Sequence, residues 1–341
     1  MLVIDLSDGS KKPGPVRNLR LGPGTLAATL GAKSAVAEAV WWSLADRKLI
    51  GRSAIFPPEY VADEGSVKFV DPVFTPDLAR CAIHGFDYGS GSVEFNFVLV
   101  VAPGVSSEQG VHLDLAGDYW EMGLEAMAVS PDGRWLVAVG MEGWFSRWDL
   151  RKVKLGRKSE GSIEAAPLLL GRADEEEDWE GGDVVAMAIS PDGKVLATGN
   201  FEGGVRLYNL RSRKQVAALQ PPAAENEQQD ACVQGLAFSP DGKRLAARSV
   251  KWVTILDTVG KAAPARLEAG EVTDAVFHPD GRRLLVGSLD GRVCVWDAAT
   301  LEDVGQYDWE IGPIHSVAVS PDGLTAAAGG ADSQVVVWDF A

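Results

Sequence analysis

Acidic and aromatic side chains recur in this chain at fixed distances from a repeated four-residue motif. Glu180, Glu268 and Glu310 each stand ten residues before a Ser-Pro-Asp-Gly or His-Pro-Asp-Gly sequence, and two of them directly follow a tryptophan. Further acids stand six residues before a Trp-Asp pair or its relative: Glu142, Glu202, Asp290 and Asp332. A carboxylate beside a tryptophan suits a lysine or arginine, which gains a charge-assisted hydrogen bond and a cation–π contact together. The pattern therefore indicates recognition of a basic group.

The motif itself occurs five times, at residues 130–133, 190–193, 239–242, 278–281 and 320–323. Proline presets φ for the second position of a type I turn, aspartate suits the third, and glycine accepts the positive φ by which two antiparallel strands pair again. Seventeen residues after each proline comes Trp-Asp or a relative: Trp148-Asp149, Tyr208-Asn209, Leu256-Asp257, Trp296-Asp297 and Trp338-Asp339. Successive prolines lie 39 to 60 residues apart, which leaves room for four short strands and their loops. The repeat predicts an all-β fold.

These hairpins and the closing Trp-Asp pairs resemble the WD-repeat β-propeller family over residues 124–340. Two upstream segments look like degraded copies of the motif at about the same spacing: 75–79 (Thr-Pro-Asp-Leu-Ala) and 22–27 (Gly-Pro-Gly-Thr-Leu-Ala). Five clear units and two degraded ones predict a seven-bladed β-propeller of four-stranded antiparallel blades. We expect one domain over 1–341, with blades 1 and 2 degenerate in about 1–115 and blades 3 to 7 clear in about 116–341.

The resemblance also implies how the ring closes. The last unit ends at 335–340 with a third strand and lacks a fourth, and the apolar segment 1–6 is suited to supply it. Closure would leave no unpaired sheet edge. Four of the five clear units carry alanine two residues before the motif, which predicts close packing near the ring axis: Ala128, Ala188, Ala237 and Ala318.

One feature that the resemblance implies is absent from this chain. The family usually places a histidine in the loop that enters each blade, hydrogen-bonded to the aspartate between the second and third strands. Here that position holds Glu180, Gln229, Glu268 and Glu310. If Glu268 lay about 4 Å from Asp290, the two carboxylates would repel by about 4 kcal/mol at an effective dielectric constant near 20. The glutamates then point into water, or one carboxyl holds a proton, or a cation or basic side chain bridges the pair.

By the family's architecture, both loop sets open on one face of the ring. That face would carry the candidate residues for partner binding: Trp120, Glu121, Glu142, Trp179, Glu180, Glu202, Glu268, Asp290, Trp309, Glu310 and Asp332. Exposed tryptophans among carboxylates would anchor a basic partner. Alternatively, each of these tryptophans lies between neighbouring blades and fills the space that the absent histidine would have used.

Composition and short motifs argue against several classes of binding partner and of enzyme. The chain has 32 basic and 48 acidic side chains and a net charge of −16, which argues against nucleic-acid binding because phosphate binding needs a positive patch. The longest lipid-like run, 97–102, is too short to span a bilayer, so no membrane partner is expected. Three cysteines cannot all pair with one another, and a reducing cytoplasm is the natural location. No Cys-x-x-Cys, His-Glu-x-x-His, Walker lysine loop or Gly-x-Ser-x-Gly sequence is present.

These observations lead to one expected function and two alternatives. We expect a non-catalytic protein-interaction scaffold, a monomeric ring without a cofactor or metal, whose acidic face binds a basic peptide or protein. The first alternative is a propeller enzyme of the metal-dependent hydrolase type that uses carboxylates at the central channel. The second is a purely structural assembly subunit.

Overall fold

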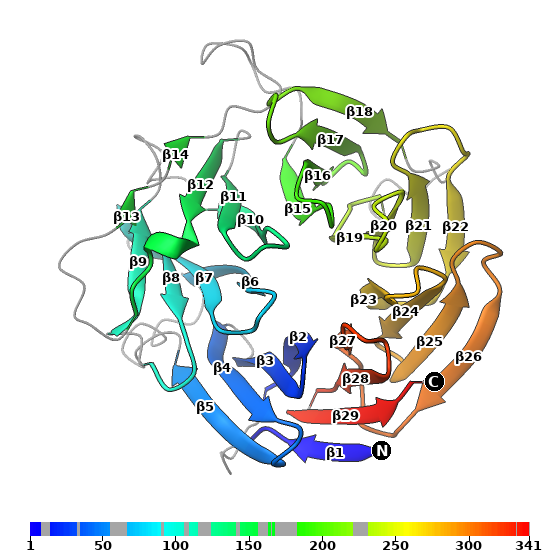
Figure 1. Ribbon diagram of the computed structural model, residues 1–341, viewed down its shortest axis with the longest axis horizontal. Coiled ribbons are helices and arrows are strands. Elements are labelled where there is room, and N and C mark those ends of the chain that lie inside the picture. Colours follow the sequence, from blue (N-terminus) through cyan, green and yellow to red (C-terminus); the bar gives the residue numbers. More distant parts are fainter. Residues whose placement is uncertain are drawn as a thin grey trace.

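Seven small antiparallel sheets stand around a central axis, so the predicted all-β, seven-bladed propeller is confirmed (Figure 1). Each blade has four antiparallel strands, and the second gains a short fifth strand that runs parallel to its neighbour. The computed structural model describes residues 1–7, 14–32, 35–54, 67–89, 92–105, 109–114, 124–140, 144–155, 163–164, 166–167, 183–220, 231–331 and 333–340.

The blades follow one another along the chain, and the first-named strand of each lies innermost (Figure 1). Blade 1 comprises β2 (Val16–Gly22), β3 (Thr25–Ala32), β4 (Ala35–Ser43) and β5 (Lys48–Ala54). Blade 2 comprises β6 (Val67–Phe74), β7 (Cys81–Gly89), β8 (Ser92–Val101), β9 (Val111–Asp114) and the added β13 (Ile163–Glu164). Blade 3 comprises β10 (Leu124–Val129), β11 (Trp135–Gly140), β12 (Phe145–Asp149) and β14 (Ala166–Pro167).

Blade 4 comprises β15 (Val184–Ile189), β16 (Val195–Asn200), β17 (Val205–Asn209) and β18 (Gln215–Leu219). Blade 5 comprises β19 (Gly235–Phe238), β20 (Arg244–Arg248), β21 (Trp252–Asp257) and β22 (Ala265–Glu268). Blade 6 comprises β23 (Val272–Phe277), β24 (Arg283–Ser288), β25 (Arg292–Asp297) and β26 (Asp303–Asp308). Blade 7 comprises β27 (Ser316–Val319), β28 (Thr325–Gly329), β29 (Gln334–Asp339) and β1 (Leu2–Asp5). Because β1 and β29 come from opposite ends of the chain, this last blade joins the two termini.

The predicted closure is confirmed by the pairing of β1. This strand runs antiparallel to β29, with Ile4 opposite Val335, and the backbone N–H of Leu6 donates to the carbonyl of Ser333 at 2.9 Å. Ile4 and Leu6 are buried in one cluster with residues of blades 1 and 7, whereas Val3 is 51% exposed. The alternating burial fixes which face of β1 points inward.

The repeated motif forms the turn between the first and second strands of its blade. In four of the turns the Ser hydroxyl donates to the Asp carboxylate two residues later at 2.5–2.7 Å, and in all five the glycine has φ between +68° and +74°. The degraded copy in blade 2 keeps this geometry: Thr75 donates to Asp77 at 2.6 Å, and Leu78 occupies the glycine position with φ +55°. In blade 1 the turn is shorter, with Gly22 opposite Thr25 and Gly24 at φ +69°. The local chemistry of the motif therefore forms this turn in blades 2 to 7.

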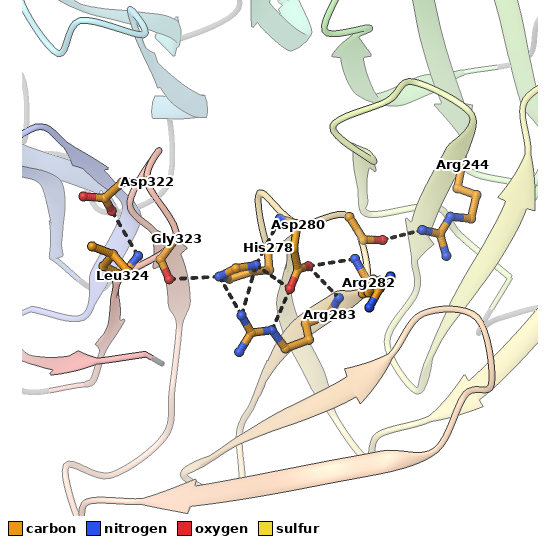
Figure 2. A network of polar contacts seen from close by, with 9 residues as sticks. Arg244, His278, Asp280, Arg282, Arg283, Asp322, Gly323 and Leu324 are labelled. Atoms are coloured by element: carbon orange, nitrogen blue, oxygen red, sulfur yellow. Dashed lines mark hydrogen bonds and ion pairs between the residues drawn. The ribbon is translucent and has the colours of Figure 1, made fainter.

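Neighbouring motif turns also bond to one another on this side of the ring, which we call the hairpin face (Figure 2). His278, which replaces the motif serine, accepts the Asp280 N–H at Nδ1, so its Nε2–H donates to the Gly323 carbonyl in blade 7 at 2.9 Å. Partial burial would raise the pKa of Asp280, but hydrogen bonds from the backbone N–H groups of Arg282 and Arg283 and from nearby side chains outweigh it and lower the pKa to about 2. Arg244 of blade 5 donates to the carbonyl of Gly281. Consecutive blades are thus joined by polar contacts.

The hydrophobic core lies between consecutive blades rather than inside any one of them. Between blades 1 and 2, the Trp41 ring meets the Phe74 ring edge to face at 5.8 Å, and Trp41 Nε1 donates to the Leu78 carbonyl at 2.8 Å. Ala128 and Ala318 are buried as expected, but the expected close packing is wrong for Ala188 and Ala237. These two are only half-buried, and they line a central cavity of about 510 Å³ together with the buried Ala128.

Two further findings concern the chain as a whole. Its three cysteines, Cys81, Cys232 and Cys294, are all free. Among the residues that the structure describes, no helix is long and apolar enough to cross a bilayer.

Candidate functional site

The acidic candidate residues that the structure describes all lie at one end of the ring. Strands alternate in direction within a blade, so the loop that enters a blade and the turn between its second and third strands lie at the same end, opposite the hairpin face. Glu202 lies between β16 and β17, Asp290 between β24 and β25, and Glu310 between β26 and β27, while Glu268 ends β22 just before the loop into β23. We call this end the entry face.

The anticipated conflict between Glu268 and Asp290 is resolved within the turn that carries Asp290. Its carboxylate accepts the Ser288 hydroxyl and pairs with the Arg292 guanidinium at 2.5 Å. Partial burial alone would raise the pKa of Asp290, but the bonds from Ser288 and from the backbone and side chain of Arg292 outweigh it and lower the pKa. Glu268 is exposed and faces solvent. The first of the three arrangements therefore holds for Glu268, and Asp290 takes its cation from its own turn.

Trp309 packs against the blade instead of standing free. Its ring stacks on Tyr307 with centroids 5.3 Å apart and planes 3° apart, and it lies 4.3 Å from the Trp338 ring. Aromatic contacts at these separations stabilise a core beyond the area they bury. Trp309 is half-buried, so the structure supports the alternative in which this tryptophan fills space beside the Trp-Asp position.

Glu310 directly follows Trp309 and projects from the entry face. Its backbone has φ +57°, and its N–H donates to the Asp308 carboxylate at 2.9 Å, while its side chain is exposed. Glu202 is also exposed, in a turn that requires Gly203 at φ +91°. Six sequence-predicted candidates lie outside the described residues: Trp120, Glu121, Glu142, Trp179, Glu180 and Asp332.

Sequence reasoning missed a basic cluster at the mouth of the channel. On the entry face the channel opens into a cavity of about 410 Å³ whose charged lining residues are Arg17, Arg20, Arg248, Glu271 and Asp274. Residues from blades 1, 5, 6 and 7 meet there, although they are spread from one end of the sequence to the other. The sequence did contain one signal for this cluster. Four clear repeats have alanine two residues before the motif, whereas the degraded first repeat has Arg20 at that position.

His315 borders the same cavity. Burial and the nearby Arg17 guanidinium both lower the pKa of His315, which keeps its ring neutral at physiological pH. Within the described ranges, no group of three or more His, Cys, Asp or Glu side chains is arranged to hold a metal ion. The charge of the mouth therefore comes from its arginines and its two carboxylates.

Comparison with known proteins gives matches to repeat proteins of one kind. The family model "WD domain, G-beta repeat" matches residues 177–209, 265–297 and 307–339. These segments end at or next to three of the Trp-Asp positions, in blades 4, 6 and 7.

Among curated proteins, the chain is 28% identical over 151 residues to the WD repeat-containing protein VIP3 of Arabidopsis thaliana, covering 39% of this chain and 45% of that protein. It is 29% identical over 132 residues to the WD repeat-containing protein SL1-17 of Schistosoma mansoni, covering 38% and 42%. It is 26% identical over 175 residues to the Protein LST8 homolog of Drosophila melanogaster, covering 48% of each. The matches thus span less than half the length of these relatives.

Proposed function

Because this chain carries WD40 repeats on a closed seven-bladed propeller, we propose that it is a non-catalytic protein-interaction scaffold whose entry face receives a basic peptide or protein. The fold alone does not choose a function, so the proposal depends on the site. One observation carries it. Glu202, Glu268 and Glu310 are exposed at the same end of the ring, and none of them forms an ion pair with any residue that the structure describes.

The proposed surface extends around the same end of the ring. It includes the candidates that the repeat register assigns to equivalent loops and turns: Trp120, Glu121, Glu142, Trp179, Glu180 and Asp332. Asp290 and Trp309 contribute less to binding in this proposal, because Asp290 already has Arg292 as a partner and Trp309 is packed on Tyr307. The solvent-facing glutamates are the main recognition groups.

Electrostatics define the kind of partner. A single exposed ion pair contributes only about 0.2–1 kcal/mol, but several carboxylates at one end of a chain of net charge −16 create a field that attracts a basic segment and raises its association rate. Exposed charges are screened over about 10 Å at 0.1 M salt. Binding through this face should therefore weaken as salt increases.

The cellular setting belongs to the same proposal. Three free cysteines suit a reducing compartment, and we place the protein in the cytoplasm. We also propose that the ring works as a monomer, because pairing of β1 with β29 completes the last blade within one chain. Solution mass measured by light scattering tests this, and a stable dimer would contradict it.

A matched pair of double variants tests the entry face. Fluorescence anisotropy of a labelled lysine-rich peptide is measured against the parent, against Glu268→Gln/Glu310→Gln, and against a control, Glu302→Gln/Asp303→Asn. The control removes the same charge from two exposed residues on the hairpin face, where the turn after β25 leads into β26. We expect the first variant to bind about 5-fold more weakly, from about 1 kcal/mol for two exposed pairs, and the control to bind like the parent.

The result that would contradict the proposal is equally specific. If both double variants lose affinity to the same extent, the attraction comes from net charge and not from the entry face. Melting temperatures of both variants are compared with that of the parent; all four substituted side chains are exposed, so we expect small shifts.

A further inference from the structure

The innermost strand of blade 1 turns two arginines toward the channel. In the pairing of β2 with β3, Arg17 lies opposite Thr29 and Arg20 opposite Ala27, so β2 contains one extra residue between them. Asn18 within this bulge has φ +47°, a left-handed conformation that costs free energy for most residues other than glycine. The first strands of blades 2, 3, 4 and 6 also contain a register shift, but only the bulge of β2 holds a non-glycine residue at positive φ among the described residues of these strands.

The bulge has a direct effect on side-chain direction. Residues three apart in a regular strand point to opposite faces, and an extra residue brings them to the same face. Accordingly Arg17 and Arg20 are both exposed, whereas Val16, Leu19 and Leu21 are buried in the core. Both arginines line the cavity at the channel mouth.

Arg20 also occupies a position that other blades keep small. It stands two residues before the turn of its blade, where four of the clear repeats have the alanines described above. A long cationic side chain at that position fills part of a channel that alanine would leave open. Neither Arg17 nor Arg20 forms an ion pair with a carboxylate in the part of the chain that the structure describes.

A third arginine, Arg248 of blade 5, lines the same cavity, and a glycine on the neighbouring strand leaves space for it. Gly235 of β19 lies opposite Arg248 of β20, and a Cβ on Gly235 would stand 2.9 Å from Arg248 Nε, so the glycine makes room for the guanidinium. Arg248 is held by donating to the Gln234 side-chain oxygen at 3.0 Å and to the Gln234 carbonyl at 2.8 Å. At the position equivalent to Arg248, three other blades have glycine: Gly199, Gly287 and Gly329.

The lining of this cavity contains fewer carboxylates than arginines. Asp274 is engaged elsewhere: its carboxylate accepts the Ser316 hydroxyl at 2.8 Å, the Val317 N–H at 3.0 Å and the Ala275 N–H at 2.9 Å. Glu271 is exposed at the rim. Three arginines and two carboxylates thus share a small cavity in a chain that is otherwise strongly acidic.

We propose that the channel mouth on the entry face binds an oxyanion, a phosphate or carboxylate group, between Arg17, Arg20 and Arg248. Guanidinium groups bind such oxyanions through paired, charge-assisted hydrogen bonds, and a partly enclosed cavity strengthens them. The cavity of about 410 Å³ accepts a phosphate or an acidic side chain. This site uses other residues and the opposite charge from the glutamates proposed above, and it does not depend on that proposal.

Isothermal titration tests the site with two probes, inorganic phosphate and a short phosphoserine peptide, with the unphosphorylated peptide as a blank. The test variant is Arg17→Gln/Arg20→Gln. The control is Arg211→Gln, an exposed arginine in the turn between β17 and β18 on the hairpin face. We expect the parent and the control to bind at least one probe, and the double variant to bind it at least about tenfold more weakly.

Each outcome decides the matter. Binding of free phosphate as tightly as the phosphopeptide assigns the site to a small anion, and tighter binding of the peptide assigns it to an anion carried by a partner; both support the site. No binding by the parent at low salt, or equal binding by Arg17→Gln/Arg20→Gln, overturns it. The Glu268→Gln/Glu310→Gln variant should keep oxyanion binding, which separates this test from that of the proposed function.

Discussion

Replacement of Ile4 by alanine tests how the ring is closed. Ile4 is 3% exposed and packs in the cluster that joins blades 1 and 7 through β1. Removing a buried isoleucine side chain beyond Cβ costs the transfer free energy of the lost carbons and a term for the cavity that remains, in total about 2–5 kcal/mol. Because Ile4 lies in a short terminal strand whose surroundings can partly relax, we expect the free energy of unfolding to fall by about 3 kcal/mol.

Val3 provides the matched control on the same strand. It is the neighbour of Ile4, pairs with Val336, and is 51% exposed. Substitution of an exposed residue away from special contacts usually changes stability by about 0.5 kcal/mol or less, so Val3→Ala should cost under about 1 kcal/mol. Both variants keep the backbone hydrogen bonds of β1, so their difference reports side-chain burial alone.

Urea unfolding followed by tryptophan fluorescence measures both values, with the midpoint and the slope fitted separately. A cost for Val3→Ala as large as that for Ile4→Ala would refute the assigned register, because a slip of one residue exchanges the two faces of the strand. If neither substitution lowers the midpoint, β1 does not close the ring in solution.

Two further predictions concern the hairpin face. Gly323→Ala should destabilise more than Gly193→Ala: both glycines have φ near +70°, but an added Cβ at Gly323 would lie 2.7 Å from the His278 ring, whereas at Gly193 it meets nothing within 4 Å. Equal shifts in melting temperature would show that the contact with His278 has no effect. Asp280 has a folded pKa of about 2, below its usual value, so it stabilises the fold above about pH 4 and this contribution is lost as pH falls toward 2; Asp280→Asn should flatten the dependence of the urea midpoint on pH in that window, and an unchanged dependence would contradict this.

The sequence was a good guide to features that depend on residues close together in the chain. Each turn is formed by four consecutive residues whose backbone preferences agree, so the turns could be located and the blades counted. Even the degraded copy at Leu78 keeps the turn with φ +55°, because Thr75 and Asp77 supply the same side-chain bond as the serine and aspartate of the clear repeats. The pairing of β1 with β29 joins opposite ends of the chain instead, and it was expected from the resemblance together with the missing fourth strand.

The candidate site was predictable only in part. Placement of Glu202, Glu268, Asp290 and Glu310 at one end of the ring follows from strand alternation and was anticipated. That Asp290 is paired with Arg292 and that Trp309 lies against Tyr307 depends on side-chain directions, which residue spacing does not fix. The expected close packing was wrong for Ala188 and Ala237, because a seven-bladed ring leaves an open channel along its axis.

By itself, then, the sequence determined the number of blades and the geometry of most of their turns, because these arise from short-range backbone preferences repeated along the chain. Only the tertiary structure decided which side chains meet at the axis. Arg17, Arg20 and Arg248 come from blades 1 and 5, and the bulge at Asn18 and the space above Gly235 direct them into one cavity. Such a cluster depends on ring closure and on a one-residue shift in strand register, and neither leaves a local pattern around the arginines themselves.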